Sequence, residues 1–234
     1  MNNLVAIPST AVMPGGRHPQ QPLIDVNFDY YLAERPKVLA HSDVLPKYLL
    51  LPEIQQLLAV TLNDRHRLLF DFLWQSGARI TEALQVRPTD LTLDTPLNSF
   101  VSLTNLKRPR QTKRVGRPSR RAVPLVDDDL ILNLKRHIET HRIKRQSPLF
   151  PLSRQAVDNA IKDRATEVDP PLSVEPSAHT LRHSFAINHL LHGADIRLIS
   201  TWLGHTSLKS TLIYLDVFGH DTNHIAIRTR FRLP

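Results

Sequence analysis

The sequence predicts a mixed α/β protein that is mostly helical and contains one small antiparallel sheet. Apolar residues recur at helical spacing over most of the chain, and only residues 99–106 and 121–126 have the features of short strands. Of its 234 residues 41% are hydrophobic, enough for a sizeable core. Its 30 lysines and arginines outnumber its 22 acids, giving a net charge of +8. This excess favours an anionic partner.

Several protein classes are excluded or disfavoured by what the sequence lacks. There is no cysteine, which rules out disulfides, thiol catalysis and cysteine metal sites. No run of 18 apolar residues occurs, so no membrane span and no membrane partner are expected. The N-terminus has no basic segment followed by a long apolar run, so it does not have the features of a secretion signal. We therefore expect a soluble cytoplasmic protein.

The first part of the chain, residues 1–46, is predicted to be an extension of the main domain. Residues 1–22 are rich in proline, glycine, serine and glutamine and are expected to be disordered. Residues 23–34 could form a helix or a strand, because their periodicity does not distinguish the two. Pro36 and Pro46 are expected to bracket a linker.

From Pro52 onward the pattern indicates a series of helices separated by cap residues. The expected helices are 52–62, 64–76 ending at Gly77, 79–87, 128–145, 153–167, a helix from Ser177 to Gly193 that holds His179, one from Asp195 to Gly204, and one that Thr206 or Ser207 begins and that holds Tyr214.

Arg182 is the first residue that suggests a functional site. On the helix that holds it, Arg182 falls between two apolar groups and is expected to be buried, where an unpaired charge is very costly. Its partner is either a carboxylate in a structural ion pair or a phosphate that the guanidinium binds in bidentate fashion. His179 lies one turn earlier, at the end of the helix that favours anions, although a histidine there is more often a capping or core residue.

Tyr214 is the second. Leu208, Leu212 and Leu215 have helical spacing and are expected to face the core, so Tyr214 is predicted to point away from them. A tyrosine on that face is usually a simple surface residue. A phenol can also act as a nucleophile that forms a covalent intermediate.

Residues 107–121, KRPRQTKRVGRPSRR, contain eight basic residues and no acid. Most charge runs are solvated. This one joins the two predicted strands and would project as a basic hairpin, which is typical of nucleic-acid binding. The expected DNA contacts are Lys107, Arg108, Arg110, Lys113, Arg114, Arg117, Arg120 and Arg121.

A metal site is the alternative that the twelve histidines suggest. His179/His183 and His220/His224 have the i, i+4 spacing of helix-borne zinc ligands. Both pairs lack the glutamate of the His-Glu-x-x-His arrangement, so no metal is expected. Arg79 likewise has a simple interpretation, a helical ion pair with Glu82. Two arginines, two histidines, a basic hairpin and a tyrosine together suit phosphoryl transfer without a metal ion.

These motifs resemble the catalytic domain of the tyrosine recombinases, also called phage integrases. GARITEAL at 77–84 is similar to the first arginine motif of the family. HTLRH at 179–183 matches its His-x-x-Arg box, and LGH at 203–205 matches its second histidine corner. Tyr214, nine residues further on, matches the nucleophile. The resemblance covers residues 47–217 and implies the tyrosine recombinase catalytic-domain fold.

The resemblance implies a site-specific DNA recombinase that cuts and rejoins strands through a 3′-phosphotyrosyl intermediate, with no cofactor and no metal. Arg79 and Arg182 would hold the phosphate, and Tyr214 would attack it. His179 and His205 would assist proton transfer and orient the phosphate.

Two further residues complete the implied site. Glu82 would support it, and Lys107, at the end of the first strand, would protonate the leaving oxygen. Lys113 is the alternative for this general acid, because the hairpin is longer than is usual in the family.

Most family members have a separate DNA-clamping domain before the catalytic domain, but only about 46 residues precede it here. The chain therefore resembles compact plasmid resolvases and inversion recombinases. The resemblance implies a catalytic domain at 47–217 and a tail at 218–234 that docks on a neighbouring subunit.

The implied partners are double-stranded DNA with inverted half-sites, accessory DNA-bending proteins and further copies of the chain, as a dimer on one site and a tetramer on two. The outcome could be integration, inversion or plasmid multimer resolution. Two alternatives stay open: a relaxing enzyme of the type IB topoisomerase kind, and a non-catalytic DNA-binding regulator with the same fold.

Overall fold

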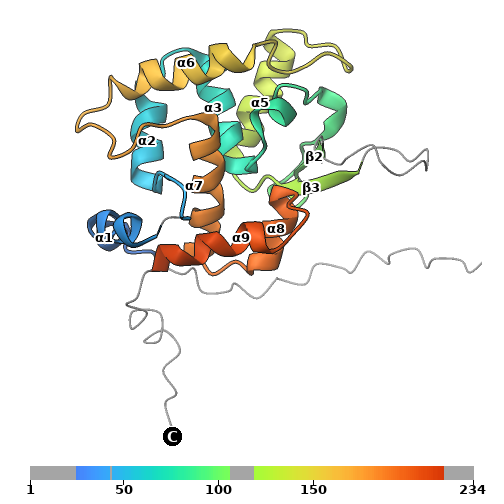
Figure 1. Ribbon diagram of the computed structural model, residues 1–234. Helices are drawn as coiled ribbons and strands as arrows, with labels where there is room; N and C mark the ends of the chain where they lie inside the picture. Colours follow the sequence, from blue (N-terminus) through green and yellow to red (C-terminus); the bar gives the residue numbers. More distant parts are fainter. Residues whose placement is uncertain (1–24, 43, 106–118, 219–234) are drawn as a thin grey trace, which may run out of the picture.

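The computed structural model describes residues 25–42, 44–105 and 119–218. In these ranges the protein is mostly helical and has one three-stranded antiparallel sheet, in the order β1-β2-β3 (Figure 1). The predicted fold class is confirmed. None of the described helices is long and apolar enough to cross a membrane.

The elements follow the expected order. The helices are α1 (Phe28–His41), α2 (Leu51–Val60), α3 (Asp64–Ser76), α4 (Ile80–Ala83), α5 (Asp128–Thr140), α6 (Arg154–Ala165), α7 (Ala178–Leu191), α8 (Ile196–Leu203) and α9 (Lys209–Leu212), with 3-10 helices η1 (Pro88–Asp90) and η2 (Ile213–Phe218). The strands are β1 (Leu91–Thr92), β2 (Phe100–Thr104) and β3 (Arg120–Pro124).

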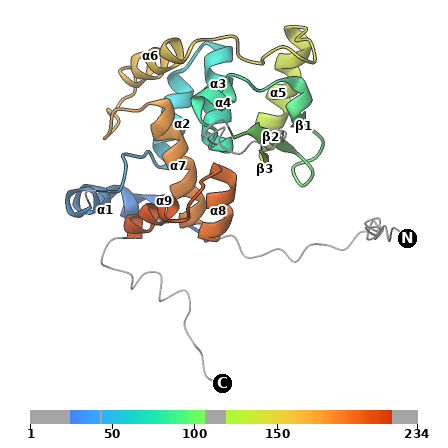
Figure 2. The same ribbon diagram turned by 45° about the vertical axis from the view of Figure 1, so that its right-hand side comes forward.

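Helix α7 is the centre of the helical body and contacts α3, α6, α8 and η2 (Figures 1 and 2). Ten of its fourteen residues are buried. It begins where predicted, because the side chain of Ser177 accepts a hydrogen bond from the backbone N–H of Thr180. A helix surrounded by protein on most sides holds its polar side chains in fixed positions, which suits it to carry a site.

The turn between α3 and α4 depends on Gly77. This residue ends α3 in the left-handed conformation, with φ of 57°, as the sequence predicted. A Cβ atom at this position would lie 2.5 Å from the ring of Phe185 on α7, so a larger residue does not fit. The turn places Arg79 at the start of α4, against the central helix.

Helix α1 corrects the prediction of a linker that begins at Pro36. The proline lies inside the helix, which continues to His41. The preceding residue, Arg35, is buried and binds both carboxylate oxygens of Glu53 on α2, at 2.6 and 2.8 Å. A proline removes one hydrogen bond from a helix and disfavours this conformation. Here the ion pair between the two helices holds α1 in place.

The other differences between the predicted and the observed elements are the lengths of two helices and one additional strand. Helix α4 is a single turn, although the sequence predicted a helix that continued to residue 87, and α5 ends at Thr140 instead of 145. Strand β1 was not predicted, because two residues are too few to show an alternating pattern.

Candidate active site

The structure brings five predicted residues together from four separate segments. Helix α7 carries His179 and Arg182, and the start of α4 carries Arg79. The corner after α8 carries His205, and η2 carries Tyr214. Four of the five lie close enough for their charges to affect one another, since Arg79 and Arg182 both act on the pKa of His205 and on that of Tyr214.

Arg182 is buried and has no carboxylate partner in the part of the chain that the structure describes. It is 3% exposed, and its guanidinium donates to the backbone oxygens of Gly77 and Leu203, both at 2.6 Å. Burial lowers its pKa to about 9, with the charge of Arg79 as the next cause, so it remains a cation at neutral pH. The carbonyl groups orient this cation without neutralising it. The arrangement therefore favours an anionic ligand over the structural ion pair.

Glu82 is the carboxylate of the site, and two arginines share it. Its buried side chain accepts from Arg79 Nη1 at 2.9 Å and from Arg121 Nη2 at 2.6 Å. Burial alone would raise the pKa of Glu82, but the hydrogen bond and the charge of Arg121, together with Arg79, hold it below the usual value. Arg182 makes no ion pair with Glu82, although it is close enough for the charge of Glu82 to act on its pKa. In this part of the described structure three guanidinium groups therefore lie near one carboxylate, which leaves an excess of positive charge.

Arg121 was predicted only as a DNA contact, and the structure places its guanidinium inside the protein. The residue is 7% exposed, and besides Glu82 it donates to Asn105 Oδ1 and to the backbone oxygen of Trp202, both at 2.6 Å. The sequence could have revealed this burial, because side chains alternate between the two faces of a strand. In β3 this alternation puts Arg121 on the same buried face as Val123. Arg120, its neighbour, faces outward and pairs with an aspartate of η1.

Tyr214 does not point away from the core as the sequence predicted. It is 1% exposed, whereas Leu208, Leu212 and Leu215 are 38%, 42% and 41% exposed. The prediction failed because it assumed that the three leucines face the core. They face outward instead, and Tyr214, on another side of the segment formed by α9 and η2, faces inward. The phenol is therefore enclosed by the protein.

His183 is the hydrogen-bond partner of Tyr214. The phenolic oxygen lies 2.8 Å from Nδ1 of His183. Burial lowers the pKa of His183 to about 4, and positive charge on His179, Arg182 and His205 contributes to this shift. Burial also raises the pKa of Tyr214 to about 12. Sequence reasoning considered His183 only as a metal ligand, and no local signal could have paired two residues that lie 31 positions apart.

The two predicted histidines both lie near this pair, close enough to act on the pKa of His183. The ring of His179 packs edge-on against that of His183, with 5.6 Å between the ring centroids. His205 Nδ1 lies 2.8 Å from Thr211 Oγ1, and burial lowers its pKa to about 4, with Arg182 as the next cause. Within the described ranges, no three histidine or acidic side chains are grouped so that they could hold a metal ion.

Other predicted residues lie outside the described residues: Lys107, Arg108, Arg110, Lys113, Arg114, Arg117, residues 1–24 and residues 219–234. The two ends of the basic segment are described, however. Asn105 donates its N–H to the oxygen of Ser119 at 2.8 Å, directly after β2 and before β3. Asn105 also accepts a hydrogen bond from Arg121. The two described ends of the segment therefore lie beside the guanidinium groups of Arg79, Arg121 and Arg182, which we call the arginine cluster.

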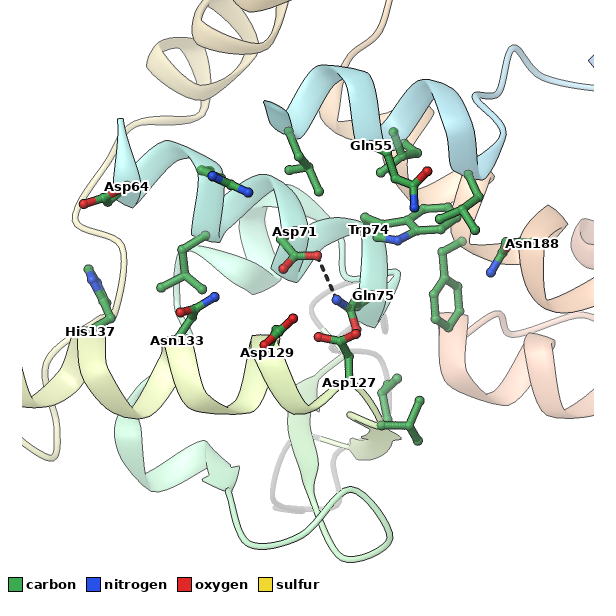
Figure 3. Close-up of a pocket in the computed structure, with 18 of the residues that line it drawn as sticks. Gln55, Asp64, Asp71, Trp74, Gln75, Asp127, Asp129, Asn133, His137 and Asn188 are labelled. Atoms are coloured by element: carbon green, nitrogen blue, oxygen red, sulfur yellow. Dashed lines mark hydrogen bonds between the residues drawn. The ribbon is translucent and has the colours of Figure 1, made fainter. Parts of the chain in front are cut away.

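A separate cavity of about 1200 Å³ is lined by four aspartates and two arginines, so acidic side chains predominate in it (Figure 3). It lies between α2, α3 and α5, and Asp71, Asp127 and Asp129 point into it from two sides. Burial raises the pKa of Asp71 to about 6, and the other two aspartates contribute. Negative charge would repel a phosphate, so this cavity is distinct from the arginine cluster in chemistry as well as in position.

Comparison with known proteins identifies relatives over most of the chain. The model of the phage integrase family matches residues 47–220. A resolvase of Escherichia coli is 32% identical over 234 aligned residues, which cover 90% of this chain and 88% of that protein. The tyrosine recombinase XerD of Staphylococcus saprophyticus is also 32% identical, over 80% of this chain and 65% of the relative.

Solved structures have the same fold. The crystal structure of XerA recombinase has a TM-score of 0.63 at 22% identity, over 82% of this chain and 66% of that one. XerH recombinase bound to its difH substrate has a TM-score of 0.62 at 22% identity, over 80% and 55%. The catalytic domain of bacteriophage HP1 integrase has a TM-score of 0.54 at 23% identity, over 80% and 95%. By its sequence, its fold and the residues that meet at Arg182, this chain belongs to the phage integrase family of tyrosine recombinases.

Proposed function

We propose that the arginine cluster beside Tyr214 is the catalytic centre of this site-specific DNA recombinase. The observation that carries the proposal is the buried guanidinium of Arg182, which two carbonyl groups orient and no described carboxylate neutralises. A buried cation of this kind is suited to bind an anion bidentately. Membership of the family and the match to E. coli resolvases favour recombination over simple DNA relaxation and over non-catalytic regulation.

In this mechanism the scissile phosphate is bound by Arg79 and Arg182 through its non-bridging oxygens. The oxygen of Tyr214 attacks the phosphorus, which forms a 3′-phosphotyrosyl bond and releases a 5′-hydroxyl. Lys107 supplies a proton to that leaving oxygen, with Lys113 as the alternative donor. The 5′-hydroxyl of a partner strand reverses the step. The energy of the phosphodiester bond is conserved, so the reaction requires neither a nucleotide nor a metal ion.

The surrounding residues stabilise charge and orient groups. Glu82 fixes Arg79 through two contacts, a side-chain ion pair at 2.9 Å and the backbone N–H of Arg79 at 3.0 Å. His179 and His205 orient the phosphate and assist proton transfer. Because these groups are already in place before DNA binds, they need little rearrangement as charge develops on the phosphate.

The proposed partner is double-stranded DNA with inverted half-sites, bound by a dimer on each site and by a tetramer on two. Residues 47–217 form the catalytic domain, residues 218–234 dock on a neighbouring subunit, and the basic segment from Lys107 to Arg120 follows the DNA backbone. Accessory DNA-bending proteins complete the assembly. A structure of XerH on its difH substrate supports DNA as the partner. Among the outcomes, resolution is favoured, because the E. coli resolvase aligns over 88% of its length.

A selection experiment tests the proposal and also recovers the target sequence. The protein is incubated in EDTA with a library of nicked duplexes with random sequence, and DNA that stays attached after denaturation is recovered and sequenced. We expect inverted repeats from the wild type and no covalent DNA from Tyr214→Phe, which should still bind duplex. Covalent DNA from Tyr214→Phe, or none from the wild type, would contradict the assignment.

A further inference from the structure

We propose that His183 is a further catalytic residue of this site, whose Nδ1 holds the Tyr214 phenol and takes its proton as the oxygen attacks the phosphate. The inference rests on the proposed role of Tyr214 as nucleophile. The resemblance to the family assigned proton transfer to His179 and His205, and it gave His183 no role. The observation that points to His183 is its contact with the phenolic oxygen.

The phenolic oxygen of Tyr214 has an acceptor for its proton within hydrogen-bond distance. Tyr214 Oη lies 2.8 Å from His183 Nδ1, and the two ring centroids are 5.8 Å apart. Tyr214 is 1% exposed, so solvent has almost no access to it. A general base must lie within hydrogen-bond reach of the proton that it removes, and His183 meets this requirement before DNA is bound.

The protonation state of the pair also suits this role. His183 is neutral at pH 7, because burial lowers its pKa to about 4. A neutral imidazole has one nitrogen that accepts and one that donates. The phenolic O–H is the stronger donor of the two groups, so we infer that Nδ1 accepts and that Nε2 carries the ring proton. This is the tautomer in which Nδ1 can receive a proton.

Substrate binding would make His183 a stronger base. The charged and titratable groups that face it are His179 and Arg182 from its own helix, His205 from the corner after α8, and Tyr214 from η2. Of these, the charge of Arg182 and any positive charge on His179 oppose protonation of His183, whereas His205, with its pKa of about 4, is neutral at pH 7. A phosphate bound at Arg182 would offset this field and raise the pKa of His183, so proton transfer is favoured when DNA is present.

The step is balanced in atoms and charge. The O–H bond of Tyr214 breaks as its oxygen bonds to phosphorus, and the proton passes to His183 Nδ1. The bond from phosphorus to the 5′-oxygen breaks, and that oxygen takes a proton from the general acid. In the reverse step a 5′-hydroxyl attacks the phosphotyrosine and gives its proton to the deprotonated general acid, and the His183 imidazolium returns its proton to the departing phenolic oxygen.

The first test uses the duplex recovered in the selection experiment and compares His183→Gln with His179→Gln. A glutamine can still accept a hydrogen bond from the phenol, but it cannot take the proton. We expect the single-turnover rate of adduct formation by His183→Gln to fall by at least about 10²-fold. In the wild type this rate falls as pH is lowered through the pKa of His183 in the DNA complex. That acid limb should disappear in His183→Gln and persist in His179→Gln. A wild-type rate and pH profile in His183→Gln would overturn the proposal.

The second test needs no DNA and does not depend on the role of Tyr214. Nitrogen NMR of histidine-labelled wild-type protein should show His183 with Nδ1 unprotonated and hydrogen-bonded, and Tyr214→Phe should shift that Nδ1 signal towards a free nitrogen. A proton on Nδ1, or no change in Tyr214→Phe, would overturn the proposal even if His183→Gln does not fold. If the wild type forms no adduct but has the expected NMR signals, the proposed function fails and the contact stands.

Discussion

Arg35 and Arg182 are equally buried, at 3% exposure, yet they are stabilised in different ways. Arg35 makes two hydrogen bonds to Glu53, at 2.6 and 2.8 Å, and one to the backbone oxygen of Tyr48. Arg182 donates only to backbone oxygens in the described part of the chain. The first is a structural ion pair. Arg182 instead keeps a positive charge in the interior, which is typical of a residue that binds an anionic ligand.

The pKa values support the same distinction. Burial would raise the pKa of Glu53, but the hydrogen bond from Arg35 holds it below its usual value, so this pair stays ionised and matched. At Arg182 burial lowers the pKa to about 9, and the charge of Arg79 adds more to this lowering than the charge of Glu82 offsets. Both arginines are equally buried, so it is the partner of each charge, and not its burial, that distinguishes a structural role from a functional one.

The largest expected effect is on stability, from Arg35→Met. This change leaves Glu53 buried without its cation, so the free energy of unfolding should fall by about 3–5 kcal/mol. Urea denaturation measures it. The double variant Arg35→Met/Glu53→Gln removes both charges and should recover a large part of the loss. A double variant no more stable than the single one would show that the pair is not matched as described.

The second prediction concerns activity. Arg182→Met should slow adduct formation by about 10²–10³-fold, because it removes a positive charge at the developing charge of the phosphate. It should lower the free energy of unfolding by less than Arg35→Met does, since it strands two carbonyl groups and no carboxylate. The two variants are compared by urea denaturation and by the adduct assay. Equal losses of stability would remove the distinction between the two arginines.

The smallest expected effect is on the pH dependence of stability, and it comes from Asp71, a group that carries a charge of the opposite sign. The folded-state pKa of Asp71 is raised to about 6 from 3.8, so the folded protein binds a proton more tightly than the unfolded chain does. Its contribution to stability therefore grows as pH falls through 6 towards 3.8, by roughly 1 kcal/mol between pH 7 and pH 5. Asp71→Asn should be the more stable protein at pH 7 and should lack this part of the pH dependence in urea denaturation. An identical pH slope in both proteins would contradict the assignment.

Local signals predicted much of the fold. Ser177 begins α7 and Gly77 ends α3, as the sequence predicted. Both cap residues depend only on the backbone of their neighbours in the chain. The burial of Arg182 followed from helical periodicity alone. Each of these features needs only the local chain geometry, which a single sequence contains.

The features that could not be predicted depend on contacts between distant residues. Helix α1 continues through Pro36 because of an ion pair with a residue 18 positions from Arg35. Tyr214 faces inward although the leucines around it suggested the opposite side as the core face, and it contacts His183 on another element. The sequence supplied the residues of the site, and the tertiary contacts determined how they pair.

The contacts of Arg121 also bear on how this chain can change during evolution or in design. Its guanidinium joins Glu82 and the backbone oxygen of Trp202 in the last turn of α8, so β3 is tied to the arginine cluster as well as to the sheet. The hydrogen bond between Asn105 and Ser119 lies just outside that contact. The pair Asn105 and Ser119 is thus a natural junction for grafting a new hairpin. A graft between these two residues would have to keep Lys107 or Lys113, because one of them is the proposed general acid.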